Sequence, residues 1–141
     1  MTNHLVIGWG EVGKAMAQVL AERGNIVSIH DPAKGFEAPE RRWDYGSPEY
    51  VSRTRASATV DEISPRVQYD WMHVCYPWHA DFAETTLSYW DRFKPDHTVV
   101  HSTVPVGTMR RLHMEGLSAN LTYSPVRGMH PDLARYMRAF P

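Results

Sequence analysis

The chain has 141 residues, a length that fits one domain and leaves little room for a second. Its formal net charge is −1, from 15 Lys and Arg against 16 Asp and Glu, so the composition does not favour nucleic-acid binding. No apolar stretch reaches membrane-spanning length, no signal peptide is recognisable, and the single cysteine, Cys75, cannot form an intrachain disulfide. We therefore expect a single domain, residues 1–141, in the reducing cytoplasm, without a membrane or nucleic-acid partner.

A glycine-rich loop follows the first apolar run. His4-Leu-Val-Ile leads into Gly8-Trp-Gly10-Glu-Val-Gly13, which has the pattern Gly-x-Gly-x-x-Gly. Gly8 permits a tight turn, Gly10 lets backbone N–H groups approach a pyrophosphate, and Gly13 lets the next helix pack closely against the strand. The N-terminus of that helix would face the phosphates. The loop therefore predicts a site for a dinucleotide.

An amphipathic helix and a second strand complete this unit. The helix has a buried face at helical spacing, made of Val12, Ala15, Met16, Val19 and Leu20. Gly24 follows it as a residue that can adopt a left-handed conformation. The strand over residues 25–30 ends on Asp31, whose carboxylate would accept hydrogen bonds from the adenosine ribose. The alternative that stays open is a glycine-rich turn without a ligand.

Strands and helices alternate through the rest of the chain. Residues 32–48 are expected to be irregular, with helical turns near 49–53 and 61–64. The expected later strands cover residues 55–60, 69–76, 98–102 and 121–124. The expected later helices cover residues 81–93, 106–113 and the segment from Pro131 onward. This alternation predicts an α/β, Rossmann-like, doubly wound and mostly parallel sheet of about six strands, in the order 3-2-1-4-5-6 with helices on both faces.

One later segment resembles a known family. His101-Ser-Thr-Val-Pro-Val-Gly-Thr108 is similar to the Ser-Thr-Val-Pro-x-Gly-Thr segment of the UDP-glucose/GDP-mannose dehydrogenase family, which also follows a first-strand glycine fingerprint. The likeness runs from Val6 to about Gly128 and implies an NAD-binding domain. In that domain the glycine loop lines the pyrophosphate, through Gly8, Trp9, Gly10, Glu11, Val12 and Gly13, while Asp31 holds the ribose. Contacts toward the nicotinamide are implied for Tyr76, Pro77, Ser102 and Thr103.

The chain also departs from this family. The family's acidic segment appears here as Tyr123-Ser-Pro-Val-Arg-Gly128, with Val126 where an acid would assist the chemistry. No segment corresponds to the family's domain with the thioester-forming cysteine, and Cys75 lies in an expected strand, where a small buried hydrophobe is the better interpretation. We expect NAD(H) binding without the full reaction. Whether this chain is an enzyme stays open.

Two other function classes stay open beside the NAD(H)-binding domain. The first is a minimal or split NAD-dependent dehydrogenase acting on an alcohol group, with His101 or His130 as a base for a small-molecule substrate bound over Thr103. The second is an S-adenosylmethionine-type nucleotide binder, against which Gly13 and the Ser-Thr-Val-Pro-Val-Gly segment count. NAD(H) is preferred over NADP(H), because Asp31 would repel a 2′-phosphate.

The remaining expectations concern metals and partners. Eight histidines are scattered along the chain without a recognisable ligand spacing, so no metal site is expected. Arg127 follows the last expected strand, where it either contacts a substrate anion or caps a neighbouring loop. Family members cover this domain with material that has no counterpart here. Leftover apolar surface would then favour a homodimer or a partner chain.

Overall fold

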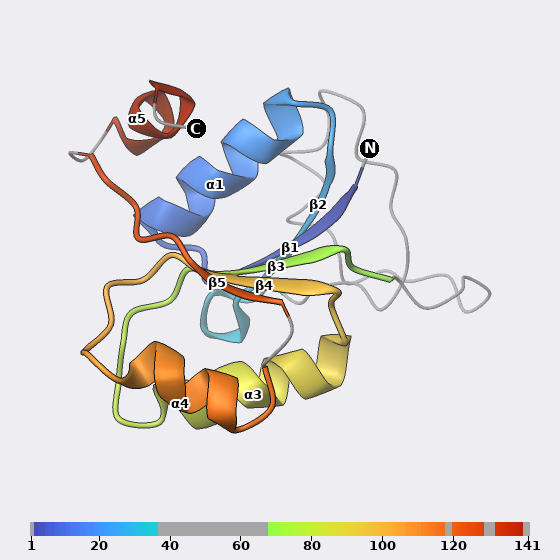
Figure 1. Ribbon diagram of the computed structural model, residues 1–141. Helices are drawn as coiled ribbons and strands as arrows, with labels where there is room; N and C mark the ends of the chain where they lie inside the picture. The colour runs from blue at the N-terminus through green and yellow to red at the C-terminus, as the bar shows by residue number, and fades with distance from the viewer. Residues whose placement is uncertain (1, 37–67, 118–119, 129–131, 140–141) are drawn as a thin grey trace.

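The computed structural model describes residues 2–36, 68–117, 120–128 and 132–139, and Figure 1 shows their arrangement. The described strands form one parallel sheet in the order β2-β1-β3-β4-β5. They are β1 (Asn3–Ile7), β2 (Ile26–His30), β3 (Trp71–Val74), β4 (His97–Val100) and β5 (Leu121–Tyr123). The predicted doubly wound α/β fold is confirmed, and so is the predicted order of these strands. The expected strand at 55–60 and the helical turns at 49–53 and 61–64 lie outside the described residues.

Helices cover both faces of the sheet. In Figure 1, α1 (Glu11–Glu22) and α5 (Leu133–Ala139) lie above the sheet, and α3 (Phe82–Phe93) and α4 (Thr108–Met114) lie below it. A short 3-10 helix, η1 (Pro32–Lys34), follows β2. In the described part of the chain, no helix combines the length and apolar character needed to cross a bilayer.

The strand order creates a switch point at the carboxyl end of β1. From β1 the chain crosses to β2 on one side, and it later returns to β3 on the other side of β1. Because these two connections run to opposite sides of β1, the loop that follows β1 and the loop that follows β3 diverge from each other. Open α/β sheets bind ligands in the crevice that opens there, outside the carboxyl ends of the strands.

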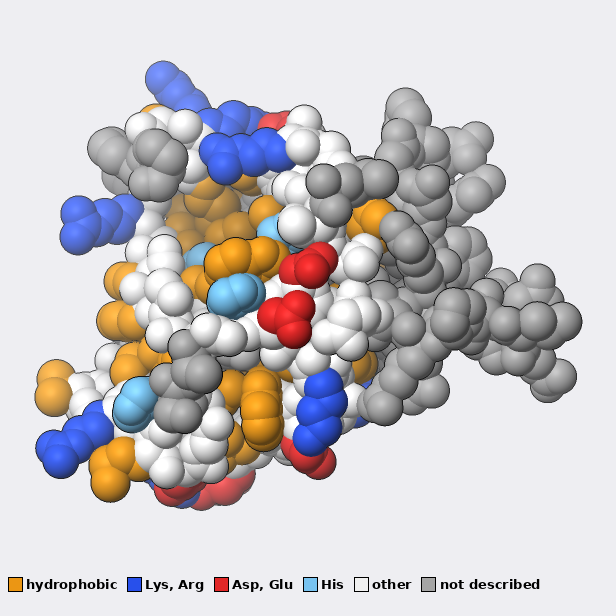
Figure 2. All heavy atoms as spheres, turned by 45° about the vertical axis from the view of Figure 1, so that its right-hand side comes forward, with side chains coloured by type: hydrophobic (Ala, Val, Ile, Leu, Met, Phe, Trp, Pro, Cys, Tyr) orange, Lys and Arg blue, Asp and Glu red, His pale blue; other side chains and the backbone are white. Residues whose placement is uncertain are grey.

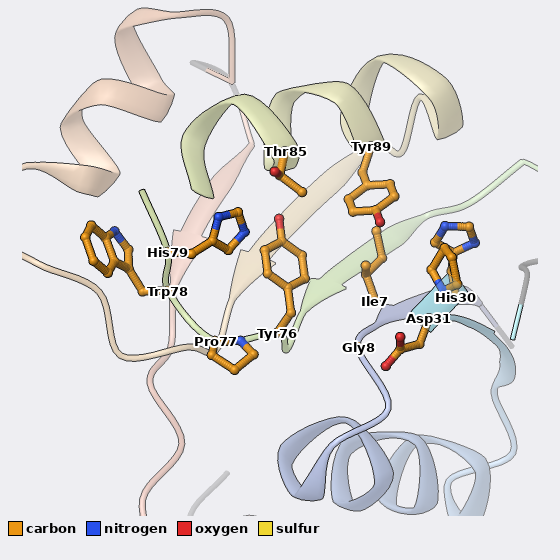
Figure 3. A pocket seen from close by; sticks show the side chains of 11 residues that line it. Ile7, Gly8, His30, Asp31, Tyr76, Pro77, Trp78, His79, Thr85 and Tyr89 are labelled. Carbon is orange, nitrogen blue, oxygen red and sulfur yellow. The ribbon is translucent and has the colours of Figure 1, made fainter. Parts of the chain in front are cut away.

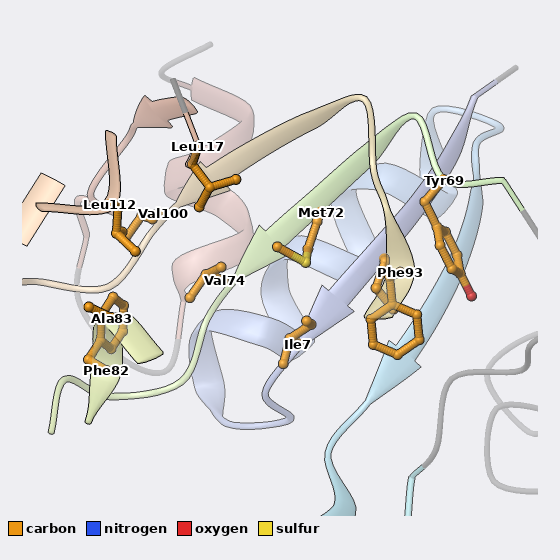
Figure 4. Close-up of a cluster of buried hydrophobic side chains, with 11 residues drawn as sticks. Ile7, Tyr69, Met72, Val74, Phe82, Ala83, Phe93, Val100, Leu112 and Leu117 are labelled. Carbon is orange, nitrogen blue, oxygen red and sulfur yellow. The ribbon is translucent and has the colours of Figure 1, made fainter. Parts of the chain in front are cut away.

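The main apolar core lies between the sheet and the α3/α4 layer (Figure 4). Alternate strand residues point to this side and meet Phe82 and Phe93 of α3 and Leu112 of α4. The strand residues are Leu5, Ile7, Met72, Val74 and Val100. Phe82 and Phe93 lie at the two ends of α3 and are both buried. This cluster fixes the positions of the strand ends that carry the candidate site.

Local backbone geometry explains where the elements differ from expectation. Gly24 has φ +77°, which confirms the left-handed residue predicted after α1. The helix expected from residue 106 begins at Thr108, because Gly107 has φ +95° and caps it in a left-handed conformation. Val106 therefore lies in the loop, fully exposed. The last helix begins at Leu133, and the expected start at Pro131 lies outside the described residues.

Charges of both signs are distributed over the surface. Among the described residues on the face in Figure 2, basic and acidic side chains are interspersed between apolar ones. Several of them form exposed ion pairs, such as Arg138 with Glu22 and Arg111 with Glu84 and Glu115. Exposed pairs of this kind contribute little to stability, so the core and the backbone ladder hold the fold.

Candidate functional site

The three glycines of the loop differ in what a side chain at each position would meet. Gly8 has φ +99°, and a Cβ there would lie 2.8 Å from the backbone nitrogen of Tyr76. A Cβ on Gly13 would lie 1.8 Å from the carbonyl oxygen of Gly8, so α1 can approach β1 only with glycine at this position. A Cβ on Gly10 would meet no atom within 4 Å. Gly8 and Gly13 therefore serve packing, whereas Gly10 leaves open space above the loop.

The N-terminus of α1 opens onto that space. Gly10 is the N-cap, and no side chain caps the first-turn N–H groups of the helix. Glu11 points outward and forms an exposed ion pair with Lys14, at 3.7 Å. Backbone N–H groups at a helix N-terminus, together with the helix dipole, attract an anion. Gly10, Glu11, Val12 and Gly13 can therefore present N–H donors to a phosphate group.

Asp31 is fixed beside the glycine loop. The backbone N–H of Trp9 donates to Oδ2 of Asp31 at 2.8 Å, and the ammonium of Lys34 donates to the carbonyl oxygen of Trp9 at 2.6 Å. Two backbone hydrogen bonds between Asp31 and Phe36 close the turn after β2. A carboxylate accepts about four hydrogen bonds in all. Asp31 thus orients the loop and still has acceptor capacity for ribose hydroxyls.

A pocket of about 340 Å³ lies at the switch point, next to Asp31 (Figure 3). It is formed by the ends of β1, β2 and β3 and by one side of α3. Its lining residues are Ile7, Gly8, His30, Asp31, Pro32, Tyr76, Pro77, Trp78, His79, Thr85 and Tyr89. Pockets for small molecules and cofactors have volumes of roughly 300–1,000 Å³, so this one suits a group of the size of a nucleoside.

Two tyrosines form neutral aromatic walls in this pocket. The hydroxyl of Thr86 donates to the carbonyl oxygen of Phe82, so the hydroxyl of Tyr76 donates to Thr86 Oγ1, at 2.6 Å. Burial raises the pKa of Tyr76 well above its usual range. Burial raises the pKa of Tyr89 too, and the charge of Asp31 adds to that shift. Both rings therefore stay uncharged and can pack against a planar heterocycle.

The structure divides the residues expected near the nicotinamide into two groups. Tyr76 and Pro77 line the pocket that contains Asp31, whereas Ser102 and Thr103 follow β4. The Ser102 hydroxyl is buried and donates to the carbonyl oxygen of Tyr76 at 2.5 Å, which ties the ends of β3 and β4 together. Thr103 is exposed beyond it. Tyr76 and Pro77 therefore lie nearer the carboxylate of Asp31 than the sequence suggested.

A second, larger cleft of about 620 Å³ lies between α1 and α5. Residues of α1 and α5 form its walls, and His101 and the segment after β5 form the rest. Arg127 lines this cleft and is exposed, and Val126 donates its backbone N–H to the carbonyl oxygen of His101 at 3.3 Å. Arg127 thus lines a cavity, as contact with a substrate anion would require.

The candidate catalytic side chains are engaged or buried. Both ring nitrogens of His101 have hydrogen-bond partners, His73 and the Ser124 carbonyl, and His130 lies outside the described residues. Cys75 is buried, and burial raises the pKa of its thiol, which disfavours a thiolate. Within the described ranges, no group of three or more His, Cys, Asp or Glu side chains could hold a metal ion.

Sequence reasoning missed several pocket residues. Thr85 and Tyr89 are four residues apart on α3 and face the pocket. His30 is the last residue of β2, and Trp78 lies in the loop between β3 and α3. The spacing of Thr85 and Tyr89 places them on one helix face, which is a usable signal. The signal does not tell which face of the sheet α3 covers, so the pocket itself could not be predicted.

Comparison with known proteins adds a likeness of fold. No family model matches the sequence, and no curated protein sequence matches it. Among solved structures, the chain is similar to the reductive aminase from Aspergillus terreus in complex with NADPH and ethyl levulinate, with 14% identity, a TM-score of 0.47 and coverage of 87% of this chain. A complex of the same enzyme with NADPH4, cyclohexanone and allyl amine gives 14% identity, a TM-score of 0.45 and 87% coverage.

The chain spans 39% and 40% of the lengths of these two structures. At 14% identity and TM-scores of 0.47 and 0.45, the likeness says nothing of the ligand or the reaction of this chain. The resemblance to the UDP-glucose/GDP-mannose dehydrogenase family therefore rests on the glycine loop and the His101–Thr108 segment alone.

Proposed function

We propose that this chain binds a nicotinamide adenine dinucleotide at the carboxyl edge of its parallel sheet. The observation that carries the proposal is the junction between the glycine loop and Asp31. The Trp9 N–H holds the carboxylate at 2.8 Å from the loop, and open space lies above Gly10. A ribose acceptor and a phosphate-binding helix N-terminus thus lie side by side at the switch point, as dinucleotide recognition requires.

The geometry supports one direction for the cofactor. The adenosine would occupy the 340 Å³ pocket, with its ribose on Asp31 and its base against Tyr76, Pro77 or Tyr89. The pyrophosphate would lie over the first turn of α1, from Gly10 to Gly13. The nicotinamide half would then extend past Ser102 toward the exposed Thr103. This direction follows from the position of Asp31 at the end of β2, on one side of the loop.

We further propose that NAD(H) is preferred over NADP(H). A 2′-phosphate on the ribose would meet the negative charge of Asp31, whereas a free hydroxyl donates to it. The ammonium of Lys34 donates to the carbonyl oxygen of Trp9, at 2.6 Å. NADPH in the two reductive aminase structures does not decide this preference, since those proteins share 14% identity with this chain.

The proposed role is that of an NAD(H)-binding domain resembling those of nucleotide-sugar dehydrogenases, in the cytoplasm and as a homodimer or with a partner chain. Val126 stands where that family has an acid, and Cys75 is buried. The alternative of a minimal dehydrogenase with His101 as its base finds less support, because both ring nitrogens of His101 are hydrogen-bonded. Oxidation of an alcohol by hydride transfer to NAD needs a base with a free acceptor for the hydroxyl proton.

Calorimetric titration of the purified chain with NAD, NADH, NADP and S-adenosylmethionine tests this proposal. We expect NAD or NADH to bind most tightly. Gly10→Ala is the sharpest variant, because its Cβ meets no protein atom but enters the space assigned to the pyrophosphate. We expect a native circular dichroism spectrum and at least about a tenfold loss of NAD affinity, which equals about 1.4 kcal/mol.

Gln18→Ala, on the exposed side of the same helix, is the matched control and should leave NAD affinity unchanged. Unchanged NAD binding by Gly10→Ala would contradict the placement of the pyrophosphate. Tighter binding of S-adenosylmethionine than of NAD would contradict the proposed cofactor.

A further inference from the structure

Three buried histidines form a row across the α1/α5 side of the sheet. His4 lies in β1, His73 in β3, and His101 directly after β4, and each is at most 7% exposed. Nδ1 of His4 lies 2.9 Å from Nε2 of His73, and Nδ1 of His73 lies 2.9 Å from Nε2 of His101. The ring planes differ by only 20° and 14°. Side chains 69 and 28 residues apart in sequence thus form one continuous hydrogen-bonded chain.

Both ends of this histidine chain continue into polar groups. Nδ1 of His101 lies 2.9 Å from the carbonyl oxygen of Ser124, at the wall of the α1/α5 cleft. At the other end, Nε2 of His4 lies 2.6 Å from the hydroxyl of Thr2, which is 3.0 Å from Oδ1 of Asn25. Thr2 precedes β1, so it marks the opposite, N-terminal edge of the sheet.

The Ser124 carbonyl fixes the direction of every bond in the neutral chain. A carbonyl only accepts, so Nδ1 of His101 carries a proton, and Nε2 of a neutral His101 must accept. His73 therefore donates from Nδ1 and accepts at Nε2, and His4 does the same. The Thr2 hydroxyl then donates to Nε2 of His4 in place of Oδ1 of Asn25, which still accepts the backbone N–H of Thr2 at 3.3 Å. All three rings carry their proton on Nδ1.

One extra proton can be held on any of the three rings without breaking a bond. With the proton on His4, Nε2 of that ring donates to Thr2, and Thr2 donates to Asn25. With the proton on His73, that ring donates to both neighbours, and each neighbour accepts on the facing nitrogen. With the proton on His101, both junctions reverse, and its Nδ1 still donates to Ser124. Two extra protons are excluded, because two N–H groups would then face each other at one of the two junctions.

We propose that His4, His73 and His101 form a relay that carries one proton between Thr2 and the α1/α5 cleft. A proton from water adds to Nε2 of His4, each Nδ1 proton shifts to the next Nε2, and the Nδ1 proton of His101 leaves to a basic group of a ligand in the cleft. The ligand's acceptor replaces the Ser124 carbonyl. Afterwards every ring carries its proton on Nε2, so the chain transfers one proton before its tautomers must be restored.

The charged groups around the relay suit a transient proton. Asp70 lies near His4 and raises its pKa, although burial is the larger effect and lowers that pKa to about 4. Burial and the two neighbouring histidines lower the pKa of His73. At the cleft end, His101 shares the lining with Arg23, Arg127 and Tyr136. Burial lowers the pKa of His101, although its bond to the Ser124 carbonyl raises it, so the neutral chain is the ground state at pH 7.

Nuclear magnetic resonance of the full chain with ¹⁵N-labelled histidine tests the relay without any dinucleotide. We expect Nδ1–H tautomers for all three residues at neutral pH and scalar couplings across both N–H···N bonds. On acidification within the pH range of the native amide spectrum, we expect the three rings to shift together and to take up one proton in total.

His73→Gln is the matched variant, because an amide accepts from His4 and donates to His101 but does not pass a proton on. We expect His4 alone to take up a proton in this variant, because the amide N–H of the glutamine already occupies Nε2 of His101, so the signals of the two rings no longer shift together. His113→Gln, at an exposed site in α4, should change nothing.

The wild-type spectra decide the proposal even where the variant fails to fold. An Nε2–H tautomer on any of the three rings at neutral pH would overturn it. So would independent titration of the rings, uptake of more than one proton by the folded chain, or unfolding before any of the three takes up a proton. Failure of dinucleotide binding would leave each of these readouts in place, so the two proposals are tested apart.

Discussion

The two faces of the sheet are built from the same strands but stabilised in different ways. On the α3/α4 face, Leu5 and Met72 join an apolar cluster with Phe82, Phe93 and Leu112. On the α1/α5 face, the alternate positions of β1 and β3 carry His4 and His73, which continue to His101. Strands of parallel sheets are usually apolar on both faces. Here the stability of the α3/α4 face depends on how well apolar side chains fill the space. Part of the α1/α5 face depends instead on hydrogen-bond donors that lie opposite acceptors.

The difference predicts how each face responds to substitution. An apolar cluster tolerates changes of shape when the total volume is kept. A buried row of hydrogen-bonded side chains tolerates only changes that keep each donor opposite an acceptor. A buried polar group without a partner has lost its hydrogen bonds to water and gains none in return, which destabilises the fold. The experiments below compare the two faces, beginning with the change expected to have the largest effect.

Phe82→Ala should cause the largest loss of stability. Phe82 is 1% exposed and lies where α3 meets the sheet, so the truncation leaves a cavity in the main core. We expect the free energy of unfolding in urea to fall by about 3–5 kcal/mol. Phe82→Leu fills most of that volume and should cost far less. Equal losses for the two variants would mean that volume does not govern this face.

His73→Leu should have a smaller effect, of a different origin. Leucine removes the middle of the histidine chain and leaves Nδ1–H of His4 and Nε2 of His101 without partners. Each buried group left unpaired costs about 1–3 kcal/mol, but burial of the leucine side chain offsets part of that cost, so we expect a net loss of about 1–3 kcal/mol in urea denaturation. His113→Leu, at an exposed position of α4, should change stability by less than about 0.5 kcal/mol. An unchanged stability of His73→Leu would show that the chain contributes nothing.

The same histidines should make the fold sensitive to acid. Burial lowers the pKa of His4 from 6.5 to about 4, and burial also lowers the pKa values of His73 and His101. Between pH 6.5 and 4 the unfolded chain binds protons that the folded chain does not. The stability is therefore fully present above pH 6.5 and is lost progressively as the pH falls toward 4.

Urea denaturation across this pH range measures the effect. Removal of one such histidine, as in His73→Leu, should reduce the slope of stability against pH by up to about 1.4 kcal/mol per pH unit. Phe82→Leu should keep the wild-type slope, because it removes no titrating group. Parallel slopes for His73→Leu and the wild type would contradict the assignment of acid sensitivity to this face.

The two faces also differ in how far their contacts could be predicted from the sequence. The glycine loop, α1 and Gly24 were predicted correctly because their geometry is set by residues close in sequence. The helix expected over residues 81–93 was likewise predicted from its local sequence and is observed as α3. The histidine chain could not be predicted, since His4 and His73 are 69 residues apart and meet only through the register of β1 against β3. The pocket residues Thr85 and Tyr89 escaped prediction for a similar reason.

Asp31→Asn tests the candidate site itself. The amide keeps the shape of the side chain but removes the negative charge and one strong acceptor for ribose hydroxyls. We expect NAD affinity to fall about tenfold, or about 1.4 kcal/mol, and NADP affinity to fall less or to rise. Asp91→Asn, an exposed acid at the end of α3, is the matched control. An equal loss for NAD and NADP would contradict the role of Asp31 in discriminating the two cofactors.

Arg138→Ala should have the smallest effect on global stability. The guanidinium of Arg138 on α5 donates to both carboxylate oxygens of Glu22 on α1, at 2.8 and 2.7 Å, and the pair is exposed. Exposed ion pairs contribute little to stability, so the melting temperature should fall by less than about 4 °C. The local effect should be larger, because this pair helps to hold α5 over the cleft. We expect faster amide hydrogen exchange in α5 for Arg138→Ala than for the neighbouring Arg135→Ala, with exchange in β1 and β3 unchanged. Equal exchange in the two variants would show that packing against α1, rather than the ion pair, holds this helix.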